Sequence, residues 1–165
     1  MTDYDFEKLN ELAKRVNQIL IQNGMSLSVA ESFTGGTISS AIVSVPGASK
    51  FFLEGIVCYS NEAKINRLGV NSATIERFGA ISTQTAEEMI LGLKRTSLAP
   101  TCAIATTGNA DVSLEKTSSD GEAFVAVAVK DKMVVNKLNF SKSRQENIVL
   151  GAIVALETLI DLVKN

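Results

Sequence analysis

Apolar residues recur every three or four positions in several segments of the chain, which is the spacing that lays one stripe along an α-helix. The stripe is clearest over residues 5–23, and Gly24 then favours an end to the helix. Ser60 and Gly69 give similar start and stop signals around a shorter segment. Apolar spacing and these capping residues together predict helices over residues 5–23, 34–45, 61–68, 82–96 and 143–164.

Short apolar runs between these helices predict strands over residues 27–30, 54–59, 101–106, 122–129 and 133–140. The last two runs flank residues 130–132 and predict a hairpin, whereas residues 107–121 are polar and form one long loop. Helices that alternate with strands and end in a hairpin predict an α/β fold, a three-layer α/β/α sandwich with a mixed sheet. We expect a single domain over residues 1–165.

The composition is that of an ordinary globular protein. The chain has 165 residues, 45% of them hydrophobic and 21% charged, with a net charge of −2 and a pI near 5.2. We expect no nucleic-acid partner, because this charge balance gives no basic field, and no membrane role, because no apolar run approaches the roughly 20 residues that span a bilayer. Cys58 and Cys102 lie in apolar runs, which predicts buried, reduced thiols and a cytoplasmic location. Apolar helix faces in a small domain favour a homo-oligomer.

The chain contains no histidine, and this limits the chemistry that it can carry. A Ser-His-Asp hydrolase and the common histidine metal sites are excluded, so a serine nucleophile needs a lysine or a tyrosine as its base. Residues 30–36 (A-E-S-F-T-G-G) place hydroxyls, a carboxylate and backbone N–H groups at a predicted helix start, which favours developing negative charge. Ser32 is therefore a candidate nucleophile. The alternative is a serine or threonine helix cap with packing glycines.

Other parts of the chain supply residues that can complete such a site. Lys64 serves as a base only if burial or a nearby cation lowers its pKa, and Tyr59 lies five residues earlier at the end of a predicted strand. A capping box over residues 143–146 fixes Arg144 in the first turn of a helix, where it suits a phosphate or a carboxylate. Thr106 ends the third predicted strand. Each residue also has a structural alternative. Lys64 can be a solvated surface lysine, Tyr59 an aromatic at the edge of the core and Arg144 a surface arginine, and the chain at Thr106 can simply turn.

Five motifs, in order, resemble the CinA C-terminal domain family, the bacterial nicotinamide-nucleotide amidohydrolases. The resemblance covers nearly the whole chain, and Y-S-N-E-A-K together with A-E-S-x-T-G-G is its most specific part. The motifs are residues 28–36 (S-V-A-E-S-F-T-G-G), 46–49 (P-G-A-S), 52–55 (F-L-E-G), 59–64 (Y-S-N-E-A-K) with 68–70 (L-G-V), and 79–82 (G-A-I-S).

The resemblance implies hydrolysis of the carboxamide of nicotinamide mononucleotide to nicotinic acid mononucleotide and ammonia. The partner is then a small-molecule nucleotide substrate, and no metal or organic cofactor is implied. Carried over by position, Ser32 is the nucleophile, Lys64 its base and Tyr59 a helper in proton transfer. The implied substrate-binding residues are Thr106, which would support the substrate, Arg144, which would bind its anionic end, and Ser49. In the acyl-transfer mechanism that we expect, N–H groups of Thr34, Gly35 and Gly36 at the helix start hold the oxyanion.

The chain departs from the family pattern at two places. Phe33 stands where the family usually has cysteine, and we expect the larger side chain to narrow the pocket beside Ser32. Residues 109–120 replace a loop usually rich in glycine and proline, which removes N–H donors suited to phosphate, and Asp111 adds negative charge near an anionic substrate. Two alternatives follow: a degenerate homologue that binds a nucleotide or a partner protein without turnover, and an amidase for a different, less anionic amide.

Overall fold

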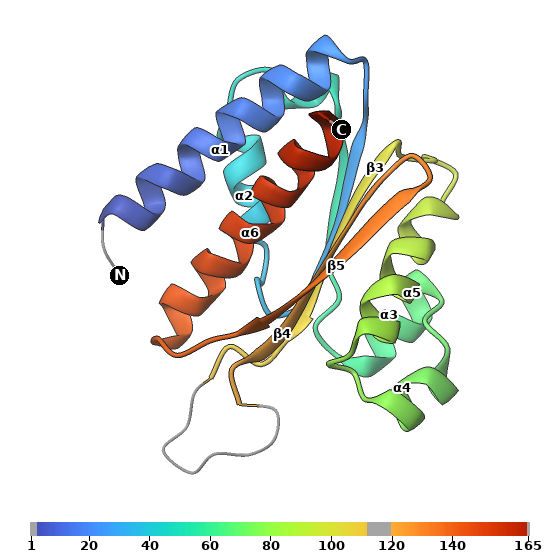
Figure 1. Ribbon diagram of the computed structural model, residues 1–165. Coiled ribbons are helices and arrows are strands. Elements are labelled where there is room, and N and C mark those ends of the chain that lie inside the picture. The colour runs from blue at the N-terminus through green and yellow to red at the C-terminus, as the bar shows by residue number, and fades with distance from the viewer. Residues whose placement is uncertain (1–2, 112–119, 165) are drawn as a thin grey trace.

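A computed structural model describes residues 3–111 and 120–164 of the chain (Figure 1). Within these residues five strands form one sheet in the order β2-β1-β3-β4-β5. β1 pairs in parallel with β2 and β3, whereas β4 is antiparallel to both β3 and β5, so the sheet is mixed as predicted. The strands are β1 (Leu27–Glu31), β2 (Phe52–Val57), β3 (Cys102–Gly108), β4 (Glu122–Val129) and β5 (Lys132–Asn139).

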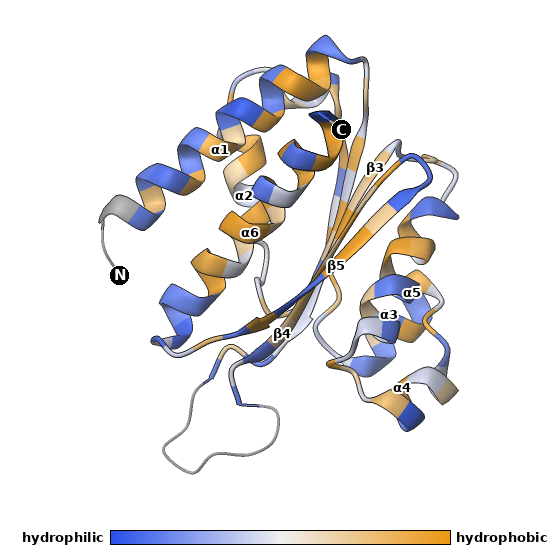
Figure 2. Cartoon of the chain, viewed as in Figure 1, coloured by the Kyte–Doolittle hydropathy of each residue, from blue (hydrophilic) through white to orange (hydrophobic). Residues whose placement is uncertain are grey.

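Helices cover both faces of the sheet, which confirms the predicted three-layer α/β/α sandwich (Figure 1). One face carries α1 (Asp3–Gln22), α2 (Thr37–Val43) and α6 (Arg144–Lys164), and a short 3-10 turn, η1 (Ala48–Lys50), precedes β2. The other face carries α3 (Asn61–Leu68), α4 (Ser72–Phe78) and α5 (Thr83–Lys94). Figure 2 shows polar and apolar residues alternating along α1 and α6, as expected for helices with one buried stripe.

Local signals in the sequence set the ends of several helices. The Ser60 hydroxyl accepts a hydrogen bond from Ala63 N at the start of α3, and Gly69 ends that helix with φ of +66°. At the start of α6, Ser143 N and Oγ both donate to the Glu146 carboxylate, which is the predicted capping box. These boundaries agree with the sequence because each depends on contacts between near neighbours in the chain.

The structure differs from the sequence reading at smaller points. β3 extends to Gly108, two residues past the predicted end, and β5 begins at Lys132, which shortens the hairpin turn. Residues 72–78 form a further helix, α4, that is not among the predicted helices, and Asn71 is its cap. Residues 112–119, which belong to the loop over residues 109–120 that departs from the family pattern, lie outside the described residues.

The prediction that Phe33 narrows the pocket beside Ser32 is wrong. Phe33 is buried in the core between the sheet and α6, with its ring centroid 5.6 Å from that of Phe140. Gly151 of α6 makes room for it, because a Cβ at this position would lie 2.5 Å from the Phe33 ring. Neighbouring residues in a turn can point to opposite sides, so the bulk of Phe33 enters the core while Ser32 faces the carboxyl ends of the strands.

Both cysteines are buried and free, as expected, and burial raises the pKa of each thiol. Of the helices in the described part of the chain, none is both long and apolar enough to cross a bilayer.

Candidate active site

Ser32 lies at the carboxyl end of β1, the strand that runs between β2 and β3. The chain leaves β1 toward α2 on one face of the sheet and leaves β2 toward α3 on the other face. The two connections therefore diverge at the carboxyl ends of adjacent strands, which is where open α/β sheets bind ligands. This topology brings residue 32 and the first turns of α3 to the same crevice.

The structure brings Ser32 and Lys64 into contact. Lys64 Nζ lies 2.9 Å from Ser32 Oγ, and it donates hydrogen bonds to the carbonyl oxygens of Cys58 at 3.0 Å and Tyr59 at 3.1 Å. Ser32 is 6% exposed and Lys64 only 2% exposed. We call Ser32 and Lys64 the reaction pair.

Burial lowers the pKa of Lys64 from the usual value for a lysine amine. Among the residues that the structure describes, no acidic side chain forms an ion pair with Lys64 that would counter this effect. A neutral amine has two N–H groups, which the carbonyls of residues 58 and 59 can accept, and one lone pair, which then points at Ser32 Oγ. The geometry thus suits proton transfer from the serine to the lysine.

The turn after Ser32 is held by a buried carboxylate that sequence reasoning did not single out. Glu31 is fully buried, and its two oxygens accept hydrogen bonds from the backbone N–H groups of Gly36, Ile38 and Ser39 and from the Ser39 hydroxyl. The A-E-S-x-T-G-G motif carried the signal, because a carboxylate shortly before a helix can satisfy its unpaired N–H groups. Glu31 therefore fixes the start of α2 and the turn that leads to it.

This arrangement changes which N–H groups can meet an oxyanion. Gly36 N donates to Glu31 and Gly35 N donates to Ser32 O at 3.1 Å, so the expected donors at these two glycines are already engaged. Within the described residues, the N–H groups of Phe33 and Thr34 have no hydrogen-bond partner. The available donors thus come from the two residues directly after Ser32.

Thr106 of β3 and Thr34 of the turn are both buried. Ser32 N donates to Thr106 O at 3.0 Å and to Thr106 Oγ1 at 3.2 Å, and the two threonine hydroxyls lie 2.8 Å apart. Because β1 and β3 are adjacent strands, Thr106 reaches Ser32 directly across the sheet. Thr106 therefore bonds to the backbone N–H of Ser32 and to the Thr34 hydroxyl, both in the segment that holds the serine.

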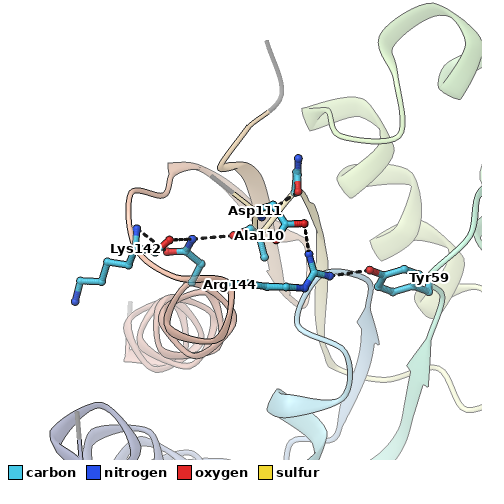
Figure 3. A network of polar contacts seen from close by, with 7 residues as sticks. Tyr59, Ala110, Asp111, Lys142 and Arg144 are labelled. Carbon is cyan, nitrogen blue, oxygen red and sulfur yellow. Dashed lines mark hydrogen bonds and ion pairs between the residues drawn. The ribbon is translucent and has the colours of Figure 1, made fainter. Parts of the chain in front are cut away.

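Tyr59 and Arg144 meet at the surface beside the reaction pair (Figure 3). Tyr59 is 62% exposed, and its hydroxyl accepts a hydrogen bond of 2.9 Å from Arg144 Nη2. Arg144 Nη1 donates to Asp111 Oδ2 at 2.6 Å, and this hydrogen bond raises the pKa of Arg144. We call Tyr59, Arg144 and Asp111 the surface network. Tyr59 accepts a hydrogen bond from Lys64 at its backbone carbonyl, whereas its hydroxyl accepts one from Arg144.

Ser49 is the one expected site residue that the structure does not bring to the others. It lies in η1, directly before β2, whereas Ser32 directly follows β1. β1 and β2 run in parallel, so these two positions lie at opposite ends of the sheet. A strand of this length separates them by about 20 Å.

A groove of about 360 Å³ between α1 and α2 also borders the turn. Its lining includes Gly35 and Gly36, together with Phe6 and Leu9 of α1, but neither residue of the reaction pair. We assign the candidate chemistry to the reaction pair, because two facing reactive groups with a shifted pKa are more specific than an open groove.

Comparison with known proteins shows the family to which the chain belongs. The family model for the CinA C-terminal domain matches residues 9–163. The chain belongs to the CinA C-terminal domain family. A CinA-like protein from Thermotoga neapolitana is 40% identical over 154 residues, which are 93% of this chain and 36% of that protein. A relative from Clostridium beijerinckii is 40% identical over 159 residues, which are 94% of this chain and 38% of the relative. The chain therefore spans well under half the length of these curated relatives.

Solved structures named for competence or damage induction share the CinA fold seen here. The competence/damage inducible protein CihA from Agrobacterium tumefaciens is 33% identical, with a TM-score of 0.88 over 94% of this chain and 95% of that one. The competence damage-inducible protein A (ComA) from Klebsiella pneumoniae is 26% identical, with a TM-score of 0.89 over 95% and 98% of the two chains. These names refer to competence and damage, so the reaction has to be argued from the site itself.

Proposed function

We propose that this CinA-family domain is an amidohydrolase that converts nicotinamide mononucleotide and water into nicotinic acid mononucleotide and ammonia. The observation that carries the proposal is the 2.9 Å contact between Ser32 Oγ and the buried Nζ of Lys64. A buried lysine with a lowered pKa is the base that a serine nucleophile needs in a chain without histidine.

In the first half of the reaction, Ser32 Oγ attacks the carbonyl carbon of the substrate amide and Lys64 Nζ takes the hydroxyl proton. The carbonyl π electrons move onto oxygen, which then carries the negative charge. The N–H groups of Phe33 and Thr34 are the donors that can meet this oxyanion, since they follow the nucleophile and have no partner within the described residues.

In the second half, Lys64 gives the proton to the amide nitrogen as the C–N bond breaks and the carbonyl re-forms. Ammonia departs, and the acyl group remains bound to Ser32 Oγ as an ester. Water then attacks this ester, with Lys64 again accepting a proton and returning it to Ser32 Oγ. The products are a carboxylic acid and the regenerated enzyme. Each step uses the same pair of atoms, so both residues of the reaction pair are required.

Recognition of the substrate's anionic end belongs in this proposal to Arg144. Its guanidinium lies at the first turn of α6, and the Tyr59 hydroxyl orients it. Residue 59 links this cation to the centre, because its carbonyl bonds to Lys64 and its side chain to Arg144.

The test is ammonia release from nicotinamide mononucleotide by the purified chain, compared with the Ser32→Ala variant. Turnover should fall at least about a hundredfold in Ser32→Ala. A matched control is Ser44→Ala at the C-cap of α2, which removes a hydroxyl that donates to Ala41 O of the same helix and should leave the rate unchanged. Circular dichroism confirms that each variant is folded.

The other outcomes are equally informative. Release from nicotinamide riboside but not from the mononucleotide would assign the chain to a less anionic amide. Release from neither compound would favour a degenerate homologue that binds a nucleotide or a partner protein without turnover.

A further inference from the structure

We propose that Asp111 sets substrate specificity by competing with the anionic group of the substrate for Arg144. The inference rests on the proposed function, because it concerns the substrate class of that same site. It predicts that the chain binds a phosphorylated substrate only slightly more tightly than the same substrate without phosphate. One substitution, of Asp111, should increase this difference in affinity.

The guanidinium of Arg144 is occupied on two sides (Figure 3). Nη1 donates to Asp111 Oδ2 at 2.6 Å and Nη2 donates to Tyr59 Oη at 2.9 Å. The side chains of Arg144 and Asp111 are 42% and 58% exposed, so a ligand can reach both. A phosphate that used the Nη1 edge would have to take the position of the Asp111 carboxylate.

Asp111 is built into the fold at this position. Its N–H donates to Asn109 Oδ1 at 3.0 Å, and its carbonyl accepts from Gly121 N at 2.7 Å, so the backbone is held on both sides. Asn147, fully buried in α6, donates to Ala110 O at 2.8 Å and ties this backbone to the helix that carries Arg144. Arg144 and Asp111 are therefore held in register by neighbouring contacts as well as by their own ion pair.

The same contacts show how the competition can be reversible. The backbone of Asp111 is fixed by hydrogen bonds, but its carboxylate lies at the surface and can leave Arg144 by rotating about its own side-chain bonds. An exposed ion pair is weak, because water and salt screen it. A substrate phosphate can thus displace Asp111, with a loss of affinity that reflects this modest contact.

The experiment compares Asp111→Asn with the parent chain, each carrying Ser32→Ala so that no turnover occurs. Asparagine keeps the size of the side chain and removes its charge. Isothermal titration calorimetry measures the binding of nicotinamide mononucleotide, nicotinamide riboside and inorganic phosphate. Asp111→Asn should tighten binding of the mononucleotide and of phosphate about fivefold, the factor that corresponds to an exposed ion pair of about 1 kcal/mol, and leave the riboside unchanged.

Two controls separate competition from a general change in charge. Asp131→Asn removes the same charge in the β4–β5 turn, at the end of β4 remote from Gly121, and should change none of the three affinities. In an Arg144→Met background, Asp111→Asn should lose its effect, because there is no guanidinium left to compete for.

The proposal is overturned if Asp111→Asn leaves phosphate and mononucleotide binding unchanged, if the riboside gains as much, or if Asp131→Asn has the same effect. A chain that releases no ammonia but whose Asp111→Asn variant still gains phosphate affinity would refute the proposed function and leave the competition standing.

Discussion

The reaction pair and the surface network are joined through Tyr59, yet the two regions differ in their exposure to solvent. Ser32 and Lys64 are almost fully buried, so their contact is strong and the pKa of Lys64 is lowered. Tyr59, Arg144 and Asp111 are exposed, so each of their contacts is screened and weak. Under the proposed function, catalysis therefore depends on burial, whereas substrate recognition depends on exposed contacts that one substitution can change.

The largest expected effect comes from replacing Lys64, the proposed base of the reaction pair. Lys64→Arg introduces a guanidinium that stays protonated, so it cannot accept the Ser32 proton. Ammonia release should fall at least about a hundredfold. Because a guanidinium fits the buried site poorly, Lys64→Met provides a second variant without a base, and it should lose activity equally. A folded Lys64→Met variant with a rate near that of the parent would remove Lys64 from the mechanism.

The lowered pKa of Lys64 makes stability depend on pH. Between this lowered pKa and the ordinary value of about 10.4, the unfolded chain binds a proton at residue 64 that the folded chain does not. The free energy of unfolding should therefore rise with pH in this window, by at most about 1.4 kcal/mol per pH unit. Urea denaturation of the parent chain and Lys64→Met at several pH values isolates this contribution.

In that experiment the difference in stability should shift in favour of the parent chain as the pH rises. The cysteine thiols titrate in a similar range, but they are present in both proteins, so the difference reports mainly on Lys64. A difference that is constant or falls with pH would show that Lys64 is charged in the folded chain.

A smaller effect, on stability, is expected in the core where Phe33, the residue after Ser32, packs against Gly151. Gly151→Ala should lower the free energy of unfolding by about 1 kcal/mol, because the clash with Phe33 outweighs the gain in helix propensity. In a Phe33→Ala background the same change should instead stabilise by about 1 kcal/mol. Thermal and urea denaturation of the four proteins check this, and equal effects in both backgrounds would show that the two residues do not interact.

The smallest effect is expected in the surface network. Tyr59→Phe removes the hydroxyl that accepts from Arg144 Nη2 and should change stability by less than about 0.5 kcal/mol. Steady-state kinetics should show a higher KM for the mononucleotide with little change in kcat, since the reaction pair is untouched. A large loss in kcat would instead assign the Tyr59 hydroxyl to proton transfer, and the two regions would act as one.

Part of the candidate site could be predicted from the sequence by physical argument. The missing histidine directs attention to a lysine base, and the helix that begins at Asn61 places Lys64 at the crevice beside β1. The role of Glu31 was missed, because a carboxylate in a motif can serve a ligand, a metal or a helix end. Only its four hydrogen bonds distinguish these possibilities.

The sequence by itself determined what depends on near neighbours: the helix caps at Ser60 and Ser143, the end of α3 at Gly69, and the alternation of helices and strands that specifies the layers. Only the tertiary structure decided what depends on distant segments. Phe33 enters the core because Gly151 leaves space, Ser49 lies at the far end because β1 and β2 are parallel, and Asp111 meets Arg144 across the fold. Close packing and strand direction fix these contacts, and neither is visible along the chain.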